Sequence, residues 1–193
     1  VYPMAEYLAD IGGQGITKAV YVQANWPVER AEAEAEWIER LALETGWPHG
    51  TVAYADMTVA DARPALDRLA RFPRVRGIRQ QFHWHPNPEY RFAARADLCD
   101  DALVQKNIAF LGGYGWTFDL QVFTGQMAGA ARLAKVCPDV NFILQHAGML
   151  EDLSDQGRTK WREGMTLLAA CPNVYAKLSG FGTFLHRLDP AEI

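Results

Sequence analysis

The chain has few cysteines, no surplus of basic residues and no long apolar run, and each absence excludes a class of protein. Its three cysteines are far apart and odd in number, so a disulfide framework is not expected. A formal net charge of −4 argues against nucleic-acid binding, which needs a basic face. Apolar runs break within about ten residues, short of the roughly 20 that span a bilayer. No signal-peptide pattern is present, so we expect a cytoplasmic protein that binds neither nucleic acid nor a membrane.

Short apolar segments that are rich in β-branched and aromatic residues alternate with longer stretches of helical periodicity. The predicted strands cover residues 18–24, 50–55, 75–79, 117–122, 141–145 and 174–178. The predicted helices cover residues 28–45, 59–72, 101–111, 124–136 and 161–170, and a helix-like stretch lies at residues 3–11. Strict alternation of this kind predicts an α/β fold with a parallel sheet and right-handed crossovers.

The same connection from helix to strand occurs three times. Residues 71–75, 136–140 and 170–174 read RFPRV, VCPDV and ACPNV, in which a proline ends the helix and a valine opens the next strand. Such repetition favours a barrel over an open sheet. An open sheet would also want a glycine-rich phosphate loop after its first strand, and residues 23–27, QANWP, offer none. We therefore expect a TIM-type (β/α)8 barrel.

The length of the chain limits how much of such a barrel it can hold. A complete (β/α)8 barrel takes about 250 residues, whereas six units at the observed spacing already use all 193. The chain begins without a methionine, and residues 188–192 have the pattern of a helix start. We expect residues 1–193 to be a single-domain fragment of a partial barrel with about six β/α units, lacking the first strand and the last one or two units.

A polar or charged residue stands at or just after the end of each of the six predicted strands. In parallel α/β proteins ligands bind at the carboxyl ends of the strands, so we expect these side chains to share one site and to indicate an enzyme. They are Gln23, Asp56, Arg79, Gln121, His146 and Lys177. The clearest of them is His146, which follows an apolar, predicted buried strand and comes two residues before a glycine. Gln23, Asp56, Asp119 and Gln121 give weaker individual signals.

Five motifs in chain order resemble a known family. They are RGIRQ at residues 76–80, HWH at 83–85, FDLQVF at 118–123, FILQHAG at 142–148 and NVYAKLSG at 173–180. Together they resemble the lactonase-type branch of the amidohydrolase superfamily, the amidohydrolase family 2 group. The resemblance implies a distorted (β/α)8 barrel that hydrolyses sugar lactones and related cyclic esters, with cousins that decarboxylate aromatic acids. It also implies a His-x-His pair on strand one and an Asp on strand eight, and neither is in this chain.

The resemblance implies catalytic roles for His146, Arg79 and Lys177. His146 matches the mid-barrel histidine that ligates a divalent metal, zinc or manganese, where metal is used and otherwise polarises the substrate carbonyl. The residues alone also allow a buried histidine bonded to backbone. Arg79 is expected to hold a carboxylate or the oxygens of a lactone, or else to pair with Asp56. Lys177 points either into the barrel, where its charge needs an ion-pair partner or a functional role, or outward between helices.

Five further residues, namely His83, His85, Gln23, Asp56 and Gln121, are expected to bind substrate. His83 and His85 form a His-x-His pair, yet they follow the strand that contains RGIRQ and precede two prolines. We therefore expect them to line the substrate mouth in a loop and not to be the metal dyad. Asp56 either bonds across the mouth or caps the helix that begins nearby. The acidic helix residues are interpreted as a solvent-exposed outer face; they are Glu29, Glu32, Glu34, Glu36 and Glu39.

The sequence thus predicts a hydrolase that opens a lactone or similar cyclic ester, which is a small-molecule substrate. The resemblance assigns the general base to the Asp of strand eight, so the whole protein is expected to be an enzyme and the 193 residues alone to be inactive. The alternatives are a metal-dependent decarboxylase on the same barrel and a non-catalytic half-barrel with a binding or structural role. The sequence predicts no oligomeric state, although two open strand edges predict poor solubility or self-association of the chain alone.

Overall fold

Six parallel strands form the centre of the computed structural model, which describes residues 2–185. The strands are β1 (Val20–Val22), β2 (Gly50–Ala53), β3 (Val75–Gln81), β4 (Thr117–Gln121), β5 (Phe142–Leu144) and β6 (Val174–Ala176). They lie in one sheet in chain order, and each strand pairs in parallel with the next. The expected α/β fold, part of a TIM-type barrel, is confirmed.

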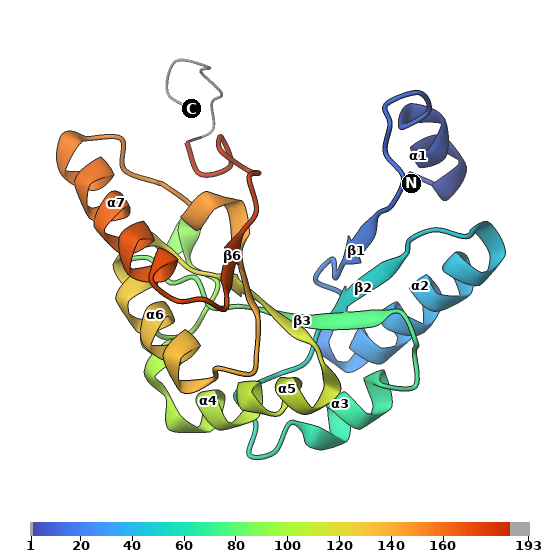
Figure 1. Ribbon diagram of the computed structural model, residues 1–193, viewed down its shortest axis with the longest axis horizontal. Helices are drawn as coiled ribbons and strands as arrows, with labels where there is room; N and C mark the ends of the chain where they lie inside the picture. The colour runs from blue at the N-terminus through green and yellow to red at the C-terminus, as the bar shows by residue number, and fades with distance from the viewer. Residues whose placement is uncertain (1, 186–193) are drawn as a thin grey trace.

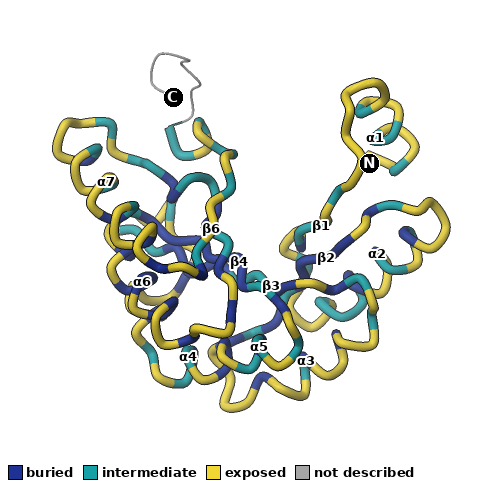
Figure 2. Tube along the Cα trace, in the orientation of Figure 1, coloured by how far each residue is buried: buried dark blue, intermediate teal, exposed yellow. Residues whose placement is uncertain are grey.

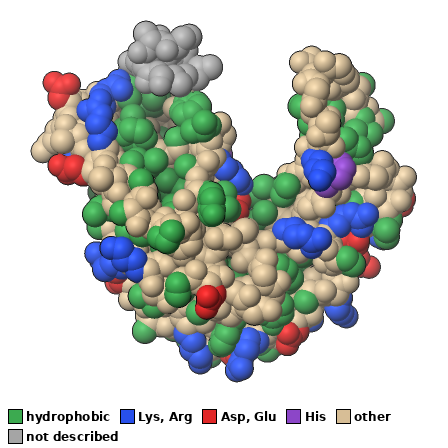
Figure 3. All heavy atoms as spheres, viewed as in Figure 1, with side chains coloured by type: hydrophobic (Ala, Val, Ile, Leu, Met, Phe, Trp, Pro, Cys, Tyr) green, Lys and Arg blue, Asp and Glu red, His purple; other side chains and the backbone are tan. Residues whose placement is uncertain are grey.

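Helices follow the strands and cover the convex side of the curved sheet (Figure 1). The α-helices of the described residues are α1 (Met4–Asp10), α2 (Ala31–Thr45), α3 (Arg63–Leu69), α4 (Ala102–Ala109), α5 (Leu111–Tyr114), α6 (Met127–Val136) and α7 (Asp155–Ala169). Helix α1 stands apart from the others, on an arm ahead of β1. The concave side of the sheet is left open, and Figure 3 shows a hollow between this arm and the side of the molecule that carries α7.

The predicted elements all occur, but many of their ends differ, and three differences matter most for the site and the fold. Strand β3 continues two residues beyond Arg79, because Gln80 and Gln81 still pair with β4. The helix predicted at residues 28–45 starts with a 3-10 turn, and α2 itself begins at Ala31. The start predicted for the last helix, residue 161, is wrong. Helix α7 begins six residues earlier, at Asp155, because the Ser154 side chain accepts a hydrogen bond from the Gly157 N–H and caps the first turn.

The sheet separates an apolar face from a polar one, because alternate side chains of a strand point to opposite sides. Five side chains of the helix-covered face are at most 1% exposed, namely Ile78, Phe118, Leu120, Phe142 and Leu144. They belong to one apolar cluster with buried residues of α3, α4 and α6. Figure 2 shows this buried centre inside a layer of more exposed helix turns. The residues between them in sequence point to the other side, which we call the interior face.

The interpretation of the acidic helix residues as a solvent-exposed face is wrong for Glu34. This side chain is only 2% exposed, because its Oε1 accepts hydrogen bonds of 2.6 Å from the Tyr21 hydroxyl and 2.6 Å from the Ala24 N–H. Glu34 therefore ties α2 to the carboxyl end of β1. The three cysteines are buried and free, as expected. Among residues 2–185, no helix combines the length and apolar character needed to cross a membrane.

Candidate functional site

The interior face carries polar side chains from neighbouring strands in matching register. Arg79 on β3 lies opposite Asp119 on β4, and Gln81 lies opposite Gln121 two residues further along the same strands. Because paired residues of parallel strands share a face, these four side chains point to the same side of the sheet. The register thus gathers Arg79 and Gln121 with Asp119, which had a weaker sequence signal, and with Gln81, which was not predicted.

An ion pair with a buried carboxylate lies beside them on the interior face. The Lys177 Nζ is 2.6 Å from Asp119 Oδ2, and the Asp119 side chain is 1% exposed. Gln145 joins both partners, since its Nε2 donates to the same carboxylate oxygen at 3.0 Å and its Oε1 accepts from Lys177 at 3.2 Å. A carboxylate out of water needs such partners, which explains why the lysine turns inward. Of the two orientations open to Lys177, the structure has the inward one.

Arg79 is a second cation on this face. Its Nη2 donates to the carbonyl oxygen of Gln23, at 2.5 Å, and its Nε is buried with no hydrogen-bond partner in the described part of the chain. Burial lowers the pKa of Arg79, while the negative charges of Asp119 and Glu34 act in the opposite direction. The alternative pairing of Arg79 with Asp56 does not occur, because Asp56 Oδ1 accepts instead from Thr58 and Gln80.

His146 follows β5 in a turn with left-handed backbone, at φ 52° and ψ 45°. Its Nδ1 lies 3.1 Å from Ser179 Oγ, in the segment that follows β6. Burial lowers the pKa of His146, and the positive charges of Arg79 and Lys177 lower it further. The imidazole is thus held neutral and close to both cations. The three residues predicted to be catalytic therefore act on one another, although they come from three different strand ends.

Five buried polar atoms near this cluster lack a hydrogen-bond partner among residues 2–185. They are Gln23 Nε2, Arg79 Nε, Gln81 Oε1, His83 Nδ1 and Gln121 Oε1. An unsatisfied buried polar group costs about 1–3 kcal/mol, so five in one region are not explained by the stability of the fold. They mark a surface on which a polar ligand would find both donors and acceptors. Donor and acceptor ends of the three glutamines are interchangeable by rotation of the amide.

His83 and His85 lie in the segment after β3, as expected, but in different surroundings. His83 is 7% exposed and stacks against Phe92 with ring centroids 5.4 Å apart. Burial lowers the pKa of His83 to about 4, with further contributions from Arg79 and His146. His85 lies further out, where its Nδ1 accepts a hydrogen bond of 3.0 Å from the Asn87 N–H. His83 therefore belongs to the cluster, and His85 belongs to its rim.

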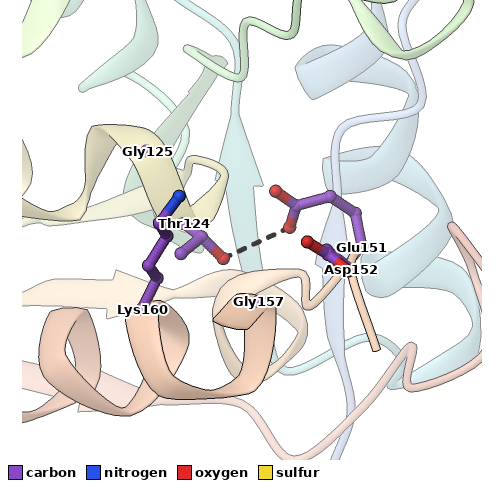
Figure 4. A pocket seen from close by; sticks show the side chains of 6 residues that line it. All are labelled: Thr124, Gly125, Glu151, Asp152, Gly157 and Lys160. Atoms are coloured by element: carbon purple, nitrogen blue, oxygen red, sulfur yellow. Dashed lines mark hydrogen bonds between the residues drawn. The ribbon is translucent and has the colours of Figure 1, made fainter. Parts of the chain in front are cut away.

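Two hollows open at the rim. The first, of ≈ 320 Å³, lies between the segment after β4 and the start of α7 and is lined by Thr124, Gly125, Glu151, Asp152, Gly157 and Lys160 (Figure 4). Glu151 accepts a hydrogen bond of 3.2 Å from the Thr124 hydroxyl, and burial raises the pKa of this carboxyl. The second hollow, of ≈ 670 Å³, shares Glu151 and Asp152 and includes His85. Glu151 thus lines both hollows, and His85 lines the second one.

The sequence analysis missed Gln81, Gln145, Ser179 and Glu151. Their residue types are common on any protein surface, and only the register and the turn after β5 bring them to the site. Glu151 had one usable signal, since it follows the predicted histidine by five residues, before a capped helix start. The capping alternative for Asp56 is wrong, because the next helix, α3, has Ala62 at its N-cap; Asp56 Oδ1 instead accepts from Thr58 and Gln80 in the turn after β2.

The described residues do not provide a complete metal site. Residues 2–185 contain no group of three His, Cys, Asp or Glu side chains placed to hold one ion. Asp119, the carboxylate nearest the cations, already binds Lys177 and Gln145 through the same oxygen. Metal ligation by His146 therefore stays a prediction, and the residues present do not fit a self-sufficient zinc or manganese centre.

Comparison with known proteins identifies the family of the chain. A family model described as Amidohydrolase matches residues 2–193. A Sinorhizobium fredii protein called "Uncharacterized protein y4mH" is 32% identical over 94% of this chain, and an L-fucono-1,5-lactonase of Burkholderia ambifaria is 27% identical over 88%. A solved amidohydrolase of Burkholderia multivorans with bound zinc has a TM-score of 0.77 at 22% identity, over 97% of this chain and 63% of that one.

The chain belongs to the amidohydrolase family, because the family model matches nearly all of its length. It spans 61% of the y4mH protein and 54% of the Burkholderia ambifaria lactonase. At 22% identity the likeness to the zinc-bound structure concerns the fold. The activity and the substrate of the whole protein are therefore treated as proposals.

Proposed function

We propose that the whole protein is a hydrolase that opens a lactone or similar cyclic ester of a small molecule. The observation that carries this proposal is the cluster of Arg79, Lys177 and His146 beside five unsatisfied polar atoms on the interior face. Relatives named L-fucono-1,5-lactonase support the choice of a lactone as the substrate. A ring ester with hydroxyl groups would supply acceptors for Arg79 and donors for the glutamine oxygens.

The chemistry needed is stabilisation of negative charge on the carbonyl oxygen when water attacks. Arg79 offers a buried N–H, and His146 offers a ring nitrogen close by. Lys177 adds positive charge from an ion pair in which the Asp119 carboxylate is buried and the lysine is partly exposed. The cations are fixed by Asp119 and the Gln23 carbonyl before substrate arrives, so little reorganisation is needed during reaction.

The resemblance also implies catalytic groups that the six strands do not contain. The resemblance assigns the general base to an Asp on an eighth strand, so the 193 residues alone are expected to give no turnover. A divalent ion, zinc or manganese, is proposed only for the whole protein, because the described residues offer no three-donor set. The roles given to Arg79, Lys177 and His146 do not depend on it.

The test is an assay of the protein expressed from its complete reading frame on a panel of sugar lactones, with and without chelator. Opening of at least one lactone is expected, and His146→Ala should lower kcat/KM by about 10²–10³-fold, the usual size for one such group. His49→Gln is the matched control, because His49 is exposed and precedes the amino end of β2. Equal losses in both variants would remove His146 from the mechanism.

The same preparation separates the alternatives. Carbon dioxide release from a carboxylated aromatic acid, without opening of any lactone, would favour the decarboxylase. Absence of both reactions in the folded whole protein would favour a non-catalytic binding or structural role. Sensitivity to the chelator would show whether the active protein uses a metal.

A further inference from the structure

Two buried glutamines of the interior face make no side-chain hydrogen bond within residues 2–185. Gln81 on β3 is 8% exposed, Gln121 on β4 is 7% exposed, and the Oε1 atom of each is buried without a partner in this range. We call this pair the open glutamines. A buried amide without partners lowers the stability of the fold, so their presence needs an explanation other than the stability of the sheet.

A third glutamine at the carboxyl end of the sheet shows what a structural role requires. Gln126 is 7% exposed, but its amide makes four hydrogen bonds of 2.8 to 3.2 Å. Its partners are backbone groups of the segments that follow β3 and β4, so Gln126 ties two loops together. The open glutamines are buried to the same extent and tie nothing together, which makes them candidates for contact with a ligand.

The open glutamines lie on neighbouring strands at the same level. Gln81 pairs with Gln121 in the register of β3 and β4. Neighbouring strands are about 4.8 Å apart, so both amides can reach the same small ligand. Gln81 also lines a hollow of ≈ 440 Å³ beside the ends of β2 and β3, whose lining includes Tyr54 and Phe92. This amide therefore borders a space that a small molecule can fill.

The charged part of the site lies two residues earlier on the same strands. Arg79 and Asp119 form the preceding pair on the interior face, and Lys177 bonds to Asp119. Two residues of a strand span about 6.6 Å, roughly the reach of one substituted six-membered ring. A ring whose carbonyl meets Arg79 would thus bring the substituents at its other end to the open glutamines.

The chemistry of the amide restricts which substituents satisfy the pair. A glutamine amide offers both donors and acceptors, and a hydroxyl group can both donate and accept, so the two match whichever way the amide is turned. A carboxylate only accepts and an ammonium group only donates, so either would leave part of each amide unsatisfied. Hydroxyl groups are therefore the substituents that fit, one for each open glutamine.

We propose that Gln81 and Gln121 are specificity-determining residues that bind two neighbouring hydroxyl groups of the substrate ring. This rests on the proposed function, in which the ring ester meets Arg79. It narrows the substrate to a lactone with hydroxyl groups on adjacent carbons, at the end of the ring away from the reacting carbonyl. The two amides then read the substrate, and the cations act on its carbonyl oxygen.

Binding of lactams to the whole protein tests the proposal without turnover, because a lactam has the shape of the lactone and resists hydrolysis. The probes are a δ-lactam with hydroxyl groups on two adjacent carbons at the far end of its ring and the unsubstituted δ-lactam. Isothermal titration calorimetry should show at least tenfold tighter binding of the hydroxylated lactam. Gln81→Leu and Gln121→Leu should each reduce this preference by about five- to tenfold, the effect of one hydrogen bond.

Two further variants are controls. Gln14→Leu should leave both affinities unchanged, because Gln14 is exposed and lies ahead of β1. Gln126→Leu should lower the unfolding temperature, because it removes four hydrogen bonds. Gln81→Leu and Gln121→Leu should not lower it, since their amides bond to nothing within residues 2–185.

Equal affinity of the parent protein for the two lactams would overturn the proposal, since water alone would then serve the amides. An unchanged preference in both leucine variants of the open glutamines, or tighter binding of a benzene dicarboxylate than of the hydroxylated lactam, would also overturn it. The expected preference in a protein that opens no lactone would instead leave the hydroxyl-binding pair standing and count against the proposed function alone.

Discussion

His83 is a buried imidazole in a largely aromatic pocket. Its ring centroid lies 5.4 Å from that of Phe92 and 5.6 Å from that of Phe123, and its Nδ1 has no hydrogen-bond partner among the residues that the structure describes. Because burial disfavours the charged form, the pKa of His83 falls from 6.5 to about 4. His83 therefore meets a substrate at neutral pH as an uncharged ring, without the charge that Arg79 and Lys177 carry.

The shift predicts how stability depends on pH. Between pH 6.5 and about 4 the unfolded chain binds a proton at His83 and the folded chain does not, so acid favours unfolding in this window. Between these pH values the unfolding free energy of the parent protein should fall by about 3 kcal/mol more than that of His83→Phe, because the variant lacks the titrating ring. Urea unfolding at pH 7, 6, 5 and 4 measures it. Leu69→Ala is the control, since it should cost about 2–4 kcal/mol at every pH.

At the scale of single residues, the sequence predicted the charged members of the site better than the uncharged ones. Arg79, His146 and Lys177 stand out because a charged or titratable residue at the end of an apolar strand needs an explanation. Gln81 and Ser179 carry no such signal in the sequence. Gln81 is recognised only by its register with Gln121, and Ser179 only by its distance of 3.1 Å to His146.

The left-handed turn after β5 depends on Gly148 for two separate reasons. Its φ of 78° is unfavourable for any residue with a Cβ, and an added Cβ would meet Met127, Met165 and Trp161 within 3.3 Å. Gly46, which ends α2, has the same φ of 78° but nothing within 4 Å of the added atom. The two glycines therefore separate the conformational cost of alanine from the steric cost.

We predict that Gly148→Ala lowers the unfolding free energy by about 2–4 kcal/mol, the sum of the conformational and overpacking costs. Gly46→Ala should lose only about 1 kcal/mol, because the conformational cost acts alone. Thermal or urea unfolding of the two variants measures both losses. Equal losses would mean that the contacts of Gly148 with α6 and α7 do not constrain the turn.

Among the elements, hydrophobic patterning predicted the strands more reliably than the ends of helices. Six apolar runs became six strands, and β2 to β5, the four inner ones, each have residues buried in the core. The start of α7 was misplaced because residues 155–160, DQGRTK, contain no apolar residue to extend the periodic pattern. Their helical state depends on the Ser154 cap, and a local signal of this kind is easily outweighed when apolar spacing is used to place a helix.

At the scale of the whole molecule, the open sheet leaves the interior face accessible to a substrate, and in the described residues it also leaves two strand edges unpaired. Helices cover the convex side, so the polar interior face is the side on which a substrate can approach (Figure 1). In the described residues β1 and β6 each pair with only one strand. Their outer edges expose unpaired backbone N–H and C=O groups, which are templates for pairing with another chain. Val20 on β1 and Tyr175 on β6 are 58% and 55% exposed and add apolar surface at these edges.

We predict that the 193-residue chain self-associates through these edges. Sedimentation velocity over a hundredfold range of concentration should show a mass that rises from monomer to dimer or above. Lysine on an edge strand opposes pairing through charge, so Val20→Lys combined with Tyr175→Lys should shift the equilibrium towards monomer by tenfold or more. Leu43→Lys is the control, because Leu43 is 71% exposed on α2, away from either edge, and should leave association unchanged. A monomer at every concentration would contradict the prediction, because it would show that the two strand edges are not available for pairing.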